Sequence, residues 1–300
     1  MNAIILSAIL GVVLMFSGIF ISNKVMLKNI AIAGIVLLLG INILEMNGYQ
    51  VVEVDTRNLL SFSKFGLLFN SIAFGATLLY FLLSARDITR VGINVAEYFA
   101  LIFFILCGVS LVSSFNSLLM LFLGIEIISI PLYILTGSDK RNLKSNEAAL
   151  KYFLMGCFST GVMLLGITLI YGAKGSFSLE TIGNVINEGR NAWFYSGLLL
   201  LLISMAFKVS VAPFHFWTPD VYDGAPTVFT SFMATIVKAA VFISMVRLFE
   251  SIFVGSGADW KLLVAVMIAA TLFIGNITAI FQQSVKRMLA YSSIAQAGFM

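Results

Sequence analysis

Residues 193 to 226 read WFYSGLLLLLISMAFKVSVAPFHFWTPDVYDGAP, an apolar run that passes directly into a proline-rich segment. The run from 193 to 215 is long enough to cross a bilayer as a helix. Three of the four prolines of the chain lie between Pro213 and Pro226. A proline inside a helix removes a backbone hydrogen bond and clashes with the carbonyl four residues earlier. We therefore expect a membrane helix that is broken near its end, with Pro226 at the start of the next helix.

The composition of the whole chain is typical of a membrane protein with several spans. Hydrophobic residues make up 60% and charged residues 11%, whereas roughly 25% of a soluble domain is charged. We expect an all-α polytopic protein with nine complete spans near 3–22, 29–46, 62–84, 96–114, 117–137, 147–172, 193–215, 226–250 and 260–282. A tenth run begins near Lys286 and reaches Met300 without a polar stop, so we expect the chain to be C-terminally truncated.

The basic residues are distributed unevenly between the two predicted sides of the membrane. Lysine and arginine together number 18, against 14 aspartates and glutamates. No nucleic-acid motif accompanies this surplus, so we attribute it to membrane orientation and expect no nucleic-acid partner. With alternate loops on opposite sides, one side carries at most six basic residues. The other side carries nine, which are Lys24, Lys28, Arg86, Arg90, Lys140, Arg141, Lys144, Lys286 and Arg287. The positive-inside rule then predicts that the N-terminus lies outside and the loop 138–146 in the cytoplasm.

The sequence contains no residue pattern that indicates a metal or a cofactor site. Cys107 and Cys157 fall in different apolar runs without metal-ligand or redox spacing, so we expect both to be buried as small hydrophobic residues. No glycine-rich phosphate loop is present, which argues against a nucleotide site.

The segment 173–192 is longer than a tight turn. Leu179, Ile182 and Ile186 have the three- and four-residue spacing of a short interfacial helix. A partly ordered loop is the alternative interpretation.

Three ionisable residues, Glu126, Lys208 and Lys238, each lie near the middle of a different predicted span. A charge at the centre of a membrane helix costs roughly 2.5 to 3.5 kcal/mol on insertion scales, so such residues are rare and usually functional. The alternative is that each charge only forms a structural salt bridge in the bundle. Two lysines to one glutamate leave a positive surplus that pairing does not remove, which favours an ion path.

Two of these charges share a backbone feature. Pro131 follows Glu126 by five residues and Pro213 follows Lys208 by five residues, so we expect the carbonyls of Ile127 and Val209 to lose their helical donors. Unsatisfied backbone groups at membrane depth are tolerated only against protein or a hydrated cavity. The pattern predicts water beside both charges.

Each charge also lies on a predicted polar face of its helix. Burial disfavours a charged lysine and a nearby carboxylate favours it, so a lysine that couples to a glutamate can load and release a proton. The predicted faces are Glu126, Ser129 and Tyr133; Ser204, Lys208 and His215; and Ser231, Thr235 and Lys238.

Three runs of the sequence resemble a known family. They are FLGIEIISIPLYIL from 122 to 135, FKVSVAPFHFWTPDVYDGAP from 207 to 226, and KRMLAYSSIAQAG from 286 to 298. They resemble the antiporter-like membrane subunits of proton-pumping NADH-quinone oxidoreductase, respiratory complex I. The resemblance covers about residue 90 onward. It is closest to the subunit N group, because Tyr222 stands where the L and M subunits typically have a histidine.

The resemblance implies roles for individual residues. Glu126, Lys208 and Lys238 match the glutamate of helix five, the lysine of the broken helix seven and the lysine of helix eight, which transfer protons in the family. His215 matches a family position, and its alternative is an interfacial histidine at a helix end. Lys151 is either a lateral proton relay or, as we favour, a lysine that snorkels to the membrane surface.

The resemblance also implies the domain organisation. The family fold repeats helices four to eight in inverted form as helices nine to thirteen. The expected parts are helices 1–3 over residues 1–90, a first repeat over 91–255, and the incomplete start of a second repeat over 256–300.

The implied partners are other membrane subunits, the lipid bilayer, protons and water. NADH, flavin, iron-sulfur clusters and quinone are expected in partner subunits, and a bacterial plasma membrane is the expected location. The alternatives are a subunit of a multi-subunit cation/proton antiporter or a membrane-bound hydrogenase, and a non-transporting membrane scaffold.

Overall fold

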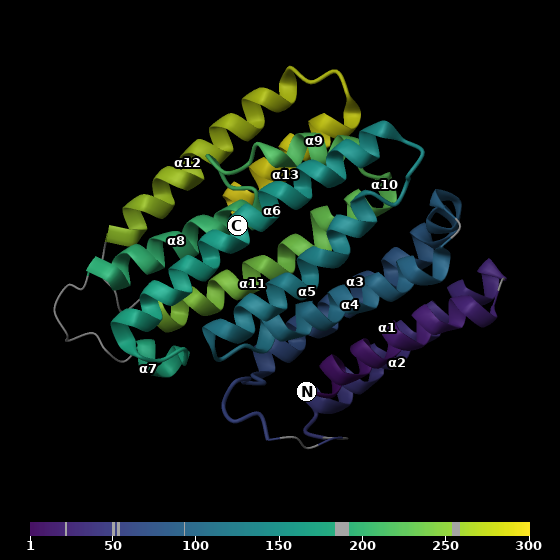
Figure 1. The fold of residues 1–300 in the computed structure, drawn as a ribbon, viewed down its shortest axis with the longest axis horizontal. Coiled ribbons are helices and arrows are strands. Elements are labelled where there is room, and N and C mark those ends of the chain that lie inside the picture. The colour runs from purple at the N-terminus through teal and green to yellow at the C-terminus, as the bar shows by residue number, and fades with distance from the viewer. Residues whose placement is uncertain (22, 50–51, 53–54, 93, 184–191, 254–258) are drawn as a thin grey trace.

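The computed structural model describes residues 1–300 except 22, 50–51, 53–54, 93, 184–191 and 254–258. The long helices lie side by side, with α12 along one edge of the bundle (Figure 1). Of the helices in the described part, nine are long and apolar enough to cross a membrane. The elements are α1 (Asn2–Phe20), α2 (Lys24–Met46), α3 (Lys64–Val91), α4 (Val95–Ser114), α5 (Leu118–Thr136), α6 (Leu143–Lys174), α7 (Leu179–Gly183), α8 (Ala192–Val209), α9 (Trp217–Gly224), α10 (Thr227–Phe232), η1 (Met233–Val237), α11 (Lys238–Leu248), η2 (Phe249–Phe253), α12 (Asp259–Ile280) and α13 (Val285–Phe299).

The nine predicted spans are confirmed, and the tenth predicted run is helical as α13. The main differences lie at the polar ends of the helices. The helix α6 begins at Leu143 rather than near 147, because the Asn142 side chain accepts a hydrogen bond from the Lys144 N–H at the new start. The helix α3 continues past 84 to Val91. Hydropathy marks where a helix leaves the apolar region, and the helix itself continues until a cap or a break ends it.

The predicted break in the seventh span lies between α8 and α9 and begins earlier than expected. The helix α8 ends at Val209, and Ser210 has a φ of 66° in the left-handed region. Pro213 therefore lies beyond the helix, so the prediction that this proline is inside the helix is wrong. The carbonyl of Phe207 instead accepts hydrogen bonds from the Ser210 N–H at 3.1 Å and from Trp217 Nε1 at 3.0 Å. A side chain from the far side of the break thus satisfies the end of α8.

The eighth span contains two π-helical turns, η1 and η2. A π turn adds a residue to the helix and rotates everything that follows it. Ser231 before η1 and Thr235 within it are exposed, whereas Lys238, directly after η1, is buried. The prediction that these three residues share one face is wrong for this reason.

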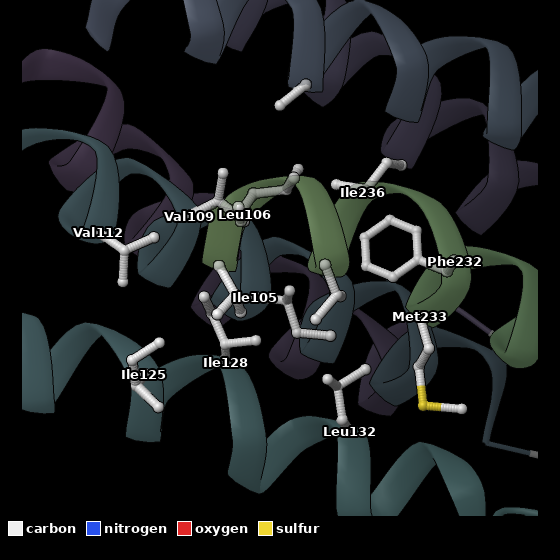
Figure 2. Close-up of a cluster of buried hydrophobic side chains, with 14 of the residues drawn as sticks. Ile105, Leu106, Val109, Val112, Ile125, Ile128, Leu132, Phe232, Met233 and Ile236 are labelled. Carbon is white, nitrogen blue, oxygen red and sulfur yellow. The ribbon is translucent and has the colours of Figure 1, made fainter. Parts of the chain in front are cut away.

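The helix α4 lies at the centre of the bundle, with 83% of its span buried. Figure 2 shows apolar side chains from α4, α5, α10 and η1 that point toward one another, among them Ile105, Ile128, Phe232 and Ile236. Gly108 of α4 and Gly124 of α5 allow the two helices to approach closely, because a side chain at either position would meet atoms of the other helix. This apolar layer positions α5, the helix that carries Glu126.

The segment after α6 contains the short helix α7, as one of the two interpretations predicted. Leu179 and Ile182 are buried and α7 packs against η2, so the protein covers the apolar face of this helix. Ile186 lies outside the described residues.

The two cysteines differ. Cys107 is buried as predicted, whereas Cys157 is exposed on α6, so the prediction for Cys157 is wrong. The side chains of α6 around it, such as Phe153 and Phe158, are exposed and apolar. Apolar neighbours in the sequence surround a small residue on a lipid-facing surface as well as one in the core, so they did not indicate that Cys157 is exposed.

Candidate functional site

Lys208 of α8 and Glu126 of α5 come close together in the bundle, and a hydroxyl group lies at the contact. Lys208 Nζ donates a hydrogen bond to Ser129 Oγ at 2.9 Å. Glu126 is near enough to act on the ammonium electrostatically. Among the described residues, Glu126 Oε1 is buried and has no hydrogen-bond partner. Glu126 and Ser129 are three residues apart on α5, so they share a helical face as predicted. The carboxylate of Glu126 and the amine of Lys208 thus lie near each other in an apolar interior, and the Ser129 hydroxyl binds the amine.

Tyr133 continues this face of α5 toward α6. Its hydroxyl is buried without a hydrogen-bond partner in the described part of the chain. Gly156 of α6 makes room for it, since any side chain there would collide with the hydroxyl. The ring contacts Tyr152 edge-on at 4.8 Å, and Tyr152 stacks on Trp217 at 4.8 Å. Aromatic contacts thus connect the glutamate helix to the segment after the break.

Behind Lys208, two serines join α6 to α8. Ser204 Oγ donates to the carbonyl of Ser159 at 2.8 Å, and the two hydroxyl oxygens are 3.1 Å apart. They line a largely apolar cavity of about 270 Å³ between the two helices. Ser204 is four residues before Lys208, as the predicted face required.

Lys238 is buried in a different environment. Its Nζ donates to the carbonyl of Ser293 at 3.0 Å and to Ser293 Oγ at 2.7 Å, and it lies 5.8 Å from the ring centre of Tyr222. Ser293 belongs to α13, so this contact connects the eighth span to the tenth. Sequence reasoning did not single out Ser293. The sequence feature that could have indicated it is a pair of adjacent serines within the run 286–298.

Lys151 lies in an ionic cluster rather than alone at the membrane surface. Its Nζ is 2.7 Å from Glu147 Oε1 and 2.8 Å from Asp220 Oδ2. Asp220 Oδ1 is in turn 2.7 Å from Arg287 Nη2. The hydrogen bond from Lys151 and the nearby Arg287 hold the pKa of the Asp220 carboxyl below its usual range. The cluster connects α6, α9 and α13.

Sequence reasoning missed the ionic roles of Asp220 and Arg287. Both are ordinary charged residues near predicted helix ends, and 67 positions separate them along the chain. Only their packing brings the two charges together.

His215 lies in the break between α8 and α9, apart from the Glu126 and Lys208 contact. The prediction that it continues the face of Ser204 and Lys208 is wrong, because α8 ends at Val209. Its Nδ1 is buried without a partner among the described residues.

Three of the predicted site residues thus form two centres, one at Glu126 and Lys208 and one at Lys238. No group of three or more histidines, cysteines, aspartates or glutamates suited to a metal ion lies in the described residues. Amines and carboxylates that are held by hydroxyl groups in an apolar interior can transfer protons when water connects them.

Comparisons with known proteins show the family of the chain. The family described as NADH:quinone oxidoreductase/Mrp antiporter, TM, matches residues 115–300. The chain is 42% identical over 300 residues to NADH-quinone oxidoreductase subunit N of Cytophaga hutchinsonii, which covers all of this chain and 64% of that protein. It is 38% identical over 301 residues to the protein of the same name from Flavobacterium psychrophilum, which covers all of this chain and 65% of that one.

Solved structures show the same fold. A chain of respiratory complex I from Thermus thermophilus superimposes with a TM-score of 0.79 at 32% identity, over 99% of this chain and 62% of that chain. A chain of an archaeal membrane-bound sulfane sulfur reductase gives a TM-score of 0.85 at 24% identity, again over 99% of this chain and 62% of that chain. The chain is an integral membrane protein, and it belongs to the NADH:quinone oxidoreductase/Mrp antiporter family.

Proposed function

We propose that this chain is part of subunit N of a proton-translocating NADH-quinone oxidoreductase and transfers protons across the membrane. The observation that carries the proposal is the hydrogen bond from Lys208 to Ser129, with the buried and unpaired Glu126 Oε1 near enough to act on the ammonium. The two relatives are named as that subunit and span about one and a half times the length of this chain. The proposal assigns NADH, flavin, iron-sulfur clusters and quinone to partner subunits.

The proposed transfer uses two centres in turn. A proton on Lys208 is stabilised while the Glu126 carboxylate is near, and is released when that carboxylate is neutralised or moves away. Ser129 Oγ accepts the hydrogen bond of the ammonium in the present arrangement. Lys238 then receives the proton or repels it onward, and its contact with Ser293 leads toward α13. Redox chemistry in the partner subunits drives the cycle by changing the charge felt at Glu126.

The expected setting is a bacterial plasma membrane, with the N-terminus outside and the basic side in the cytoplasm. Neighbouring membrane subunits are the expected partners. The excess of basic residues on one predicted side supports this orientation. The matching chains from multi-subunit complexes support an assembled form.

The test uses the intact assembled complex in sealed vesicles. Glu126→Ala and Lys208→Ala are each compared with the wild type by the number of protons moved per NADH oxidised. We expect the number of protons moved per NADH to fall in both variants, because the loss of an acid–base group typically slows proton transfer by about 100-fold or more. Glu180→Ala and Lys64→Ala are the matched controls, since both side chains are exposed and remote from the site.

Unchanged pumping per NADH in both variants would refute the transport role and favour a scaffold. Sodium movement in place of proton movement would favour the cation/proton antiporter. The tyrosine at position 222 argues against the antiporter, because those proteins typically have a histidine there.

A further inference from the structure

A hollow of about 430 Å³ lies where four helix ends meet, and its lining residues do not belong to the lysine centres. The helices α3 and α4 are joined on one side of it, and α5 and α6 on the other. Its wall includes residues of both connections. Because helix ends in a membrane bundle lie near the bilayer surface, the hollow opens at the level of the lipid headgroups.

The hollow is strongly basic. Arg90, Lys140 and Arg141 line it, against a single acidic lining residue, Asp139. Arg90 makes only a long, exposed ion pair of 3.5 Å with Asp87. In the described structure, Lys140 and Arg141 have no ion pair. The cationic groups therefore keep most of their capacity to bind an anion.

A fourth positive charge lies at the rim. Lys24 Nζ donates to the carbonyl of Thr89 at 2.9 Å and to that of Gly92 at 3.2 Å, and Gly92 lines the hollow. The ammonium caps the C-terminal end of α3 and stays beside the opening.

The wall also contains a buried hydroxyl that lacks a partner. Ser138 is 8% exposed, and its Oγ has no hydrogen-bond partner in the described part of the chain. Its carbonyl accepts a hydrogen bond from the Tyr98 hydroxyl at 3.3 Å, so the residue is held in place. The helix α4 starts at the hollow, and Asn94 makes no side-chain capping bond there. Free N–H groups at a helix start favour anions.

We propose that this hollow binds the phosphate of an anionic phospholipid. A phosphate group suits three cationic side chains, a hydroxyl and a helix N-terminus. The lipid is favoured over free phosphate because apolar side chains for acyl chains lie within two turns on the same helices. Leu83 of α3 is 81% exposed and Ile134 of α5 is 53% exposed. The proposal is independent of the proton-transfer role.

The experiment uses the assembled complex in nanodiscs that contain a photoreactive phosphatidylglycerol, with photoreactive phosphatidylcholine in a parallel sample. Crosslinked peptides of this chain are quantified by mass spectrometry. We expect the phosphatidylglycerol probe to label the peptides around Arg90 and Ser138. The variant Lys140→Gln/Arg141→Gln should reduce this labelling by about tenfold or more, since each basic residue near the surface contributes to anionic-lipid attraction.

The control is Lys28→Gln/Arg86→Gln, which removes the same charge on the same predicted side but does not change the lining of the hollow. It should label like the wild type. Equal labelling in the two double variants overturns the proposal, as does equal labelling by phosphatidylcholine. Labelling that millimolar inorganic phosphate abolishes shows a site for the free anion, and this result also overturns the lipid assignment. Ser138→Ala provides a second variant without a charge change, and it should lower the labelling severalfold.

Discussion

Lys208 and Lys238 are two amines in the same apolar bundle, and the structure surrounds them differently. Lys208 lies at the end of a helix that breaks one residue later, next to a hydroxyl and near the carboxylate of Glu126. Lys238 follows a π turn and donates to both the carbonyl and the hydroxyl of Ser293. The described structure places no acidic group in an ion pair with either amine.

The different surroundings indicate which of the two amines responds to a change of charge on a neighbouring group. The environment of Lys208 changes whenever Glu126 gains or loses a proton, because an acid nearby is a variable charge. The carbonyl of Ser293 is a fixed dipole, so it holds the Lys238 ammonium in the same way throughout. We therefore interpret Lys208 as the group that responds and Lys238 as the group that receives.

The largest expected effect comes from matched substitutions of the two amines. Both Lys208→Met and Lys238→Met should lower proton pumping by about 100-fold. Only Lys208→Met leaves Glu126 without a nearby cation, so it alone should destabilise the complex. Lys238→Met leaves no acid unpaired, whereas removal of one partner of a buried pair of charges is strongly destabilising. Pumping in vesicles and thermal denaturation of the assembled complex separate the two predictions, and equal destabilisation by both variants contradicts the comparison.

A smaller effect is expected for Ser129→Ala. The variant removes the hydrogen-bond acceptor of the Lys208 ammonium, and a hydrogen bond to a charged group contributes about 1.5 to 3 kcal/mol. Pumping should fall about tenfold or more at constant NADH oxidation by the uncoupled complex, and its pH profile should shift. Ser129→Thr keeps the hydroxyl and should restore most of the rate. A pH profile identical to that of the wild type would show that Ser129 is only a packing residue.

The effect of Ser293→Ala should be smaller again. The variant removes one of the two acceptors of Lys238 and leaves the backbone carbonyl at 3.0 Å in place. We expect a decrease in pumping of severalfold, corresponding to about 1 kcal/mol for a partly replaced hydrogen bond. A loss as large as that of Lys238→Met would mean that the hydroxyl, rather than the amine, transfers the proton.

The smallest effect is expected for Asp220→Asn, which removes the ion pairs to Lys151 and Arg287. Both pairs are about a third exposed, so solvent screening leaves each of them less than about 1 kcal/mol. Because the pKa of Asp220 lies below its ordinary 3.8, the contribution is complete above that value and is lost as the pH falls through the lowered value. The stability difference between variant and wild type should therefore be constant from about pH 5 to pH 7 and disappear only in stronger acid. A difference that already declines near neutral pH would contradict the assignment.

Much of the fold followed from local features of the sequence. The nine spans, the break after Lys208 and the shared face of Glu126 and Ser129 were all predicted correctly. The prediction that Ser231, Thr235 and Lys238 share one face was wrong. A π turn lies between the first and the last of them, and the sequence pattern did not indicate this turn. Pro213 was also misplaced relative to the break, since Ser210 had already left the helix.

The sequence alone determined that this protein crosses a membrane many times and carries ionisable groups at membrane depth. Apolar run length, proline position and charge are properties of neighbouring residues. The tertiary structure decided what those groups touch. Lys208 and Ser129 are 79 positions apart, and Lys238 and Ser293 are 55 positions apart. Hydrogen bonds act over about 3 Å, so such partners are determined only once the helices have packed.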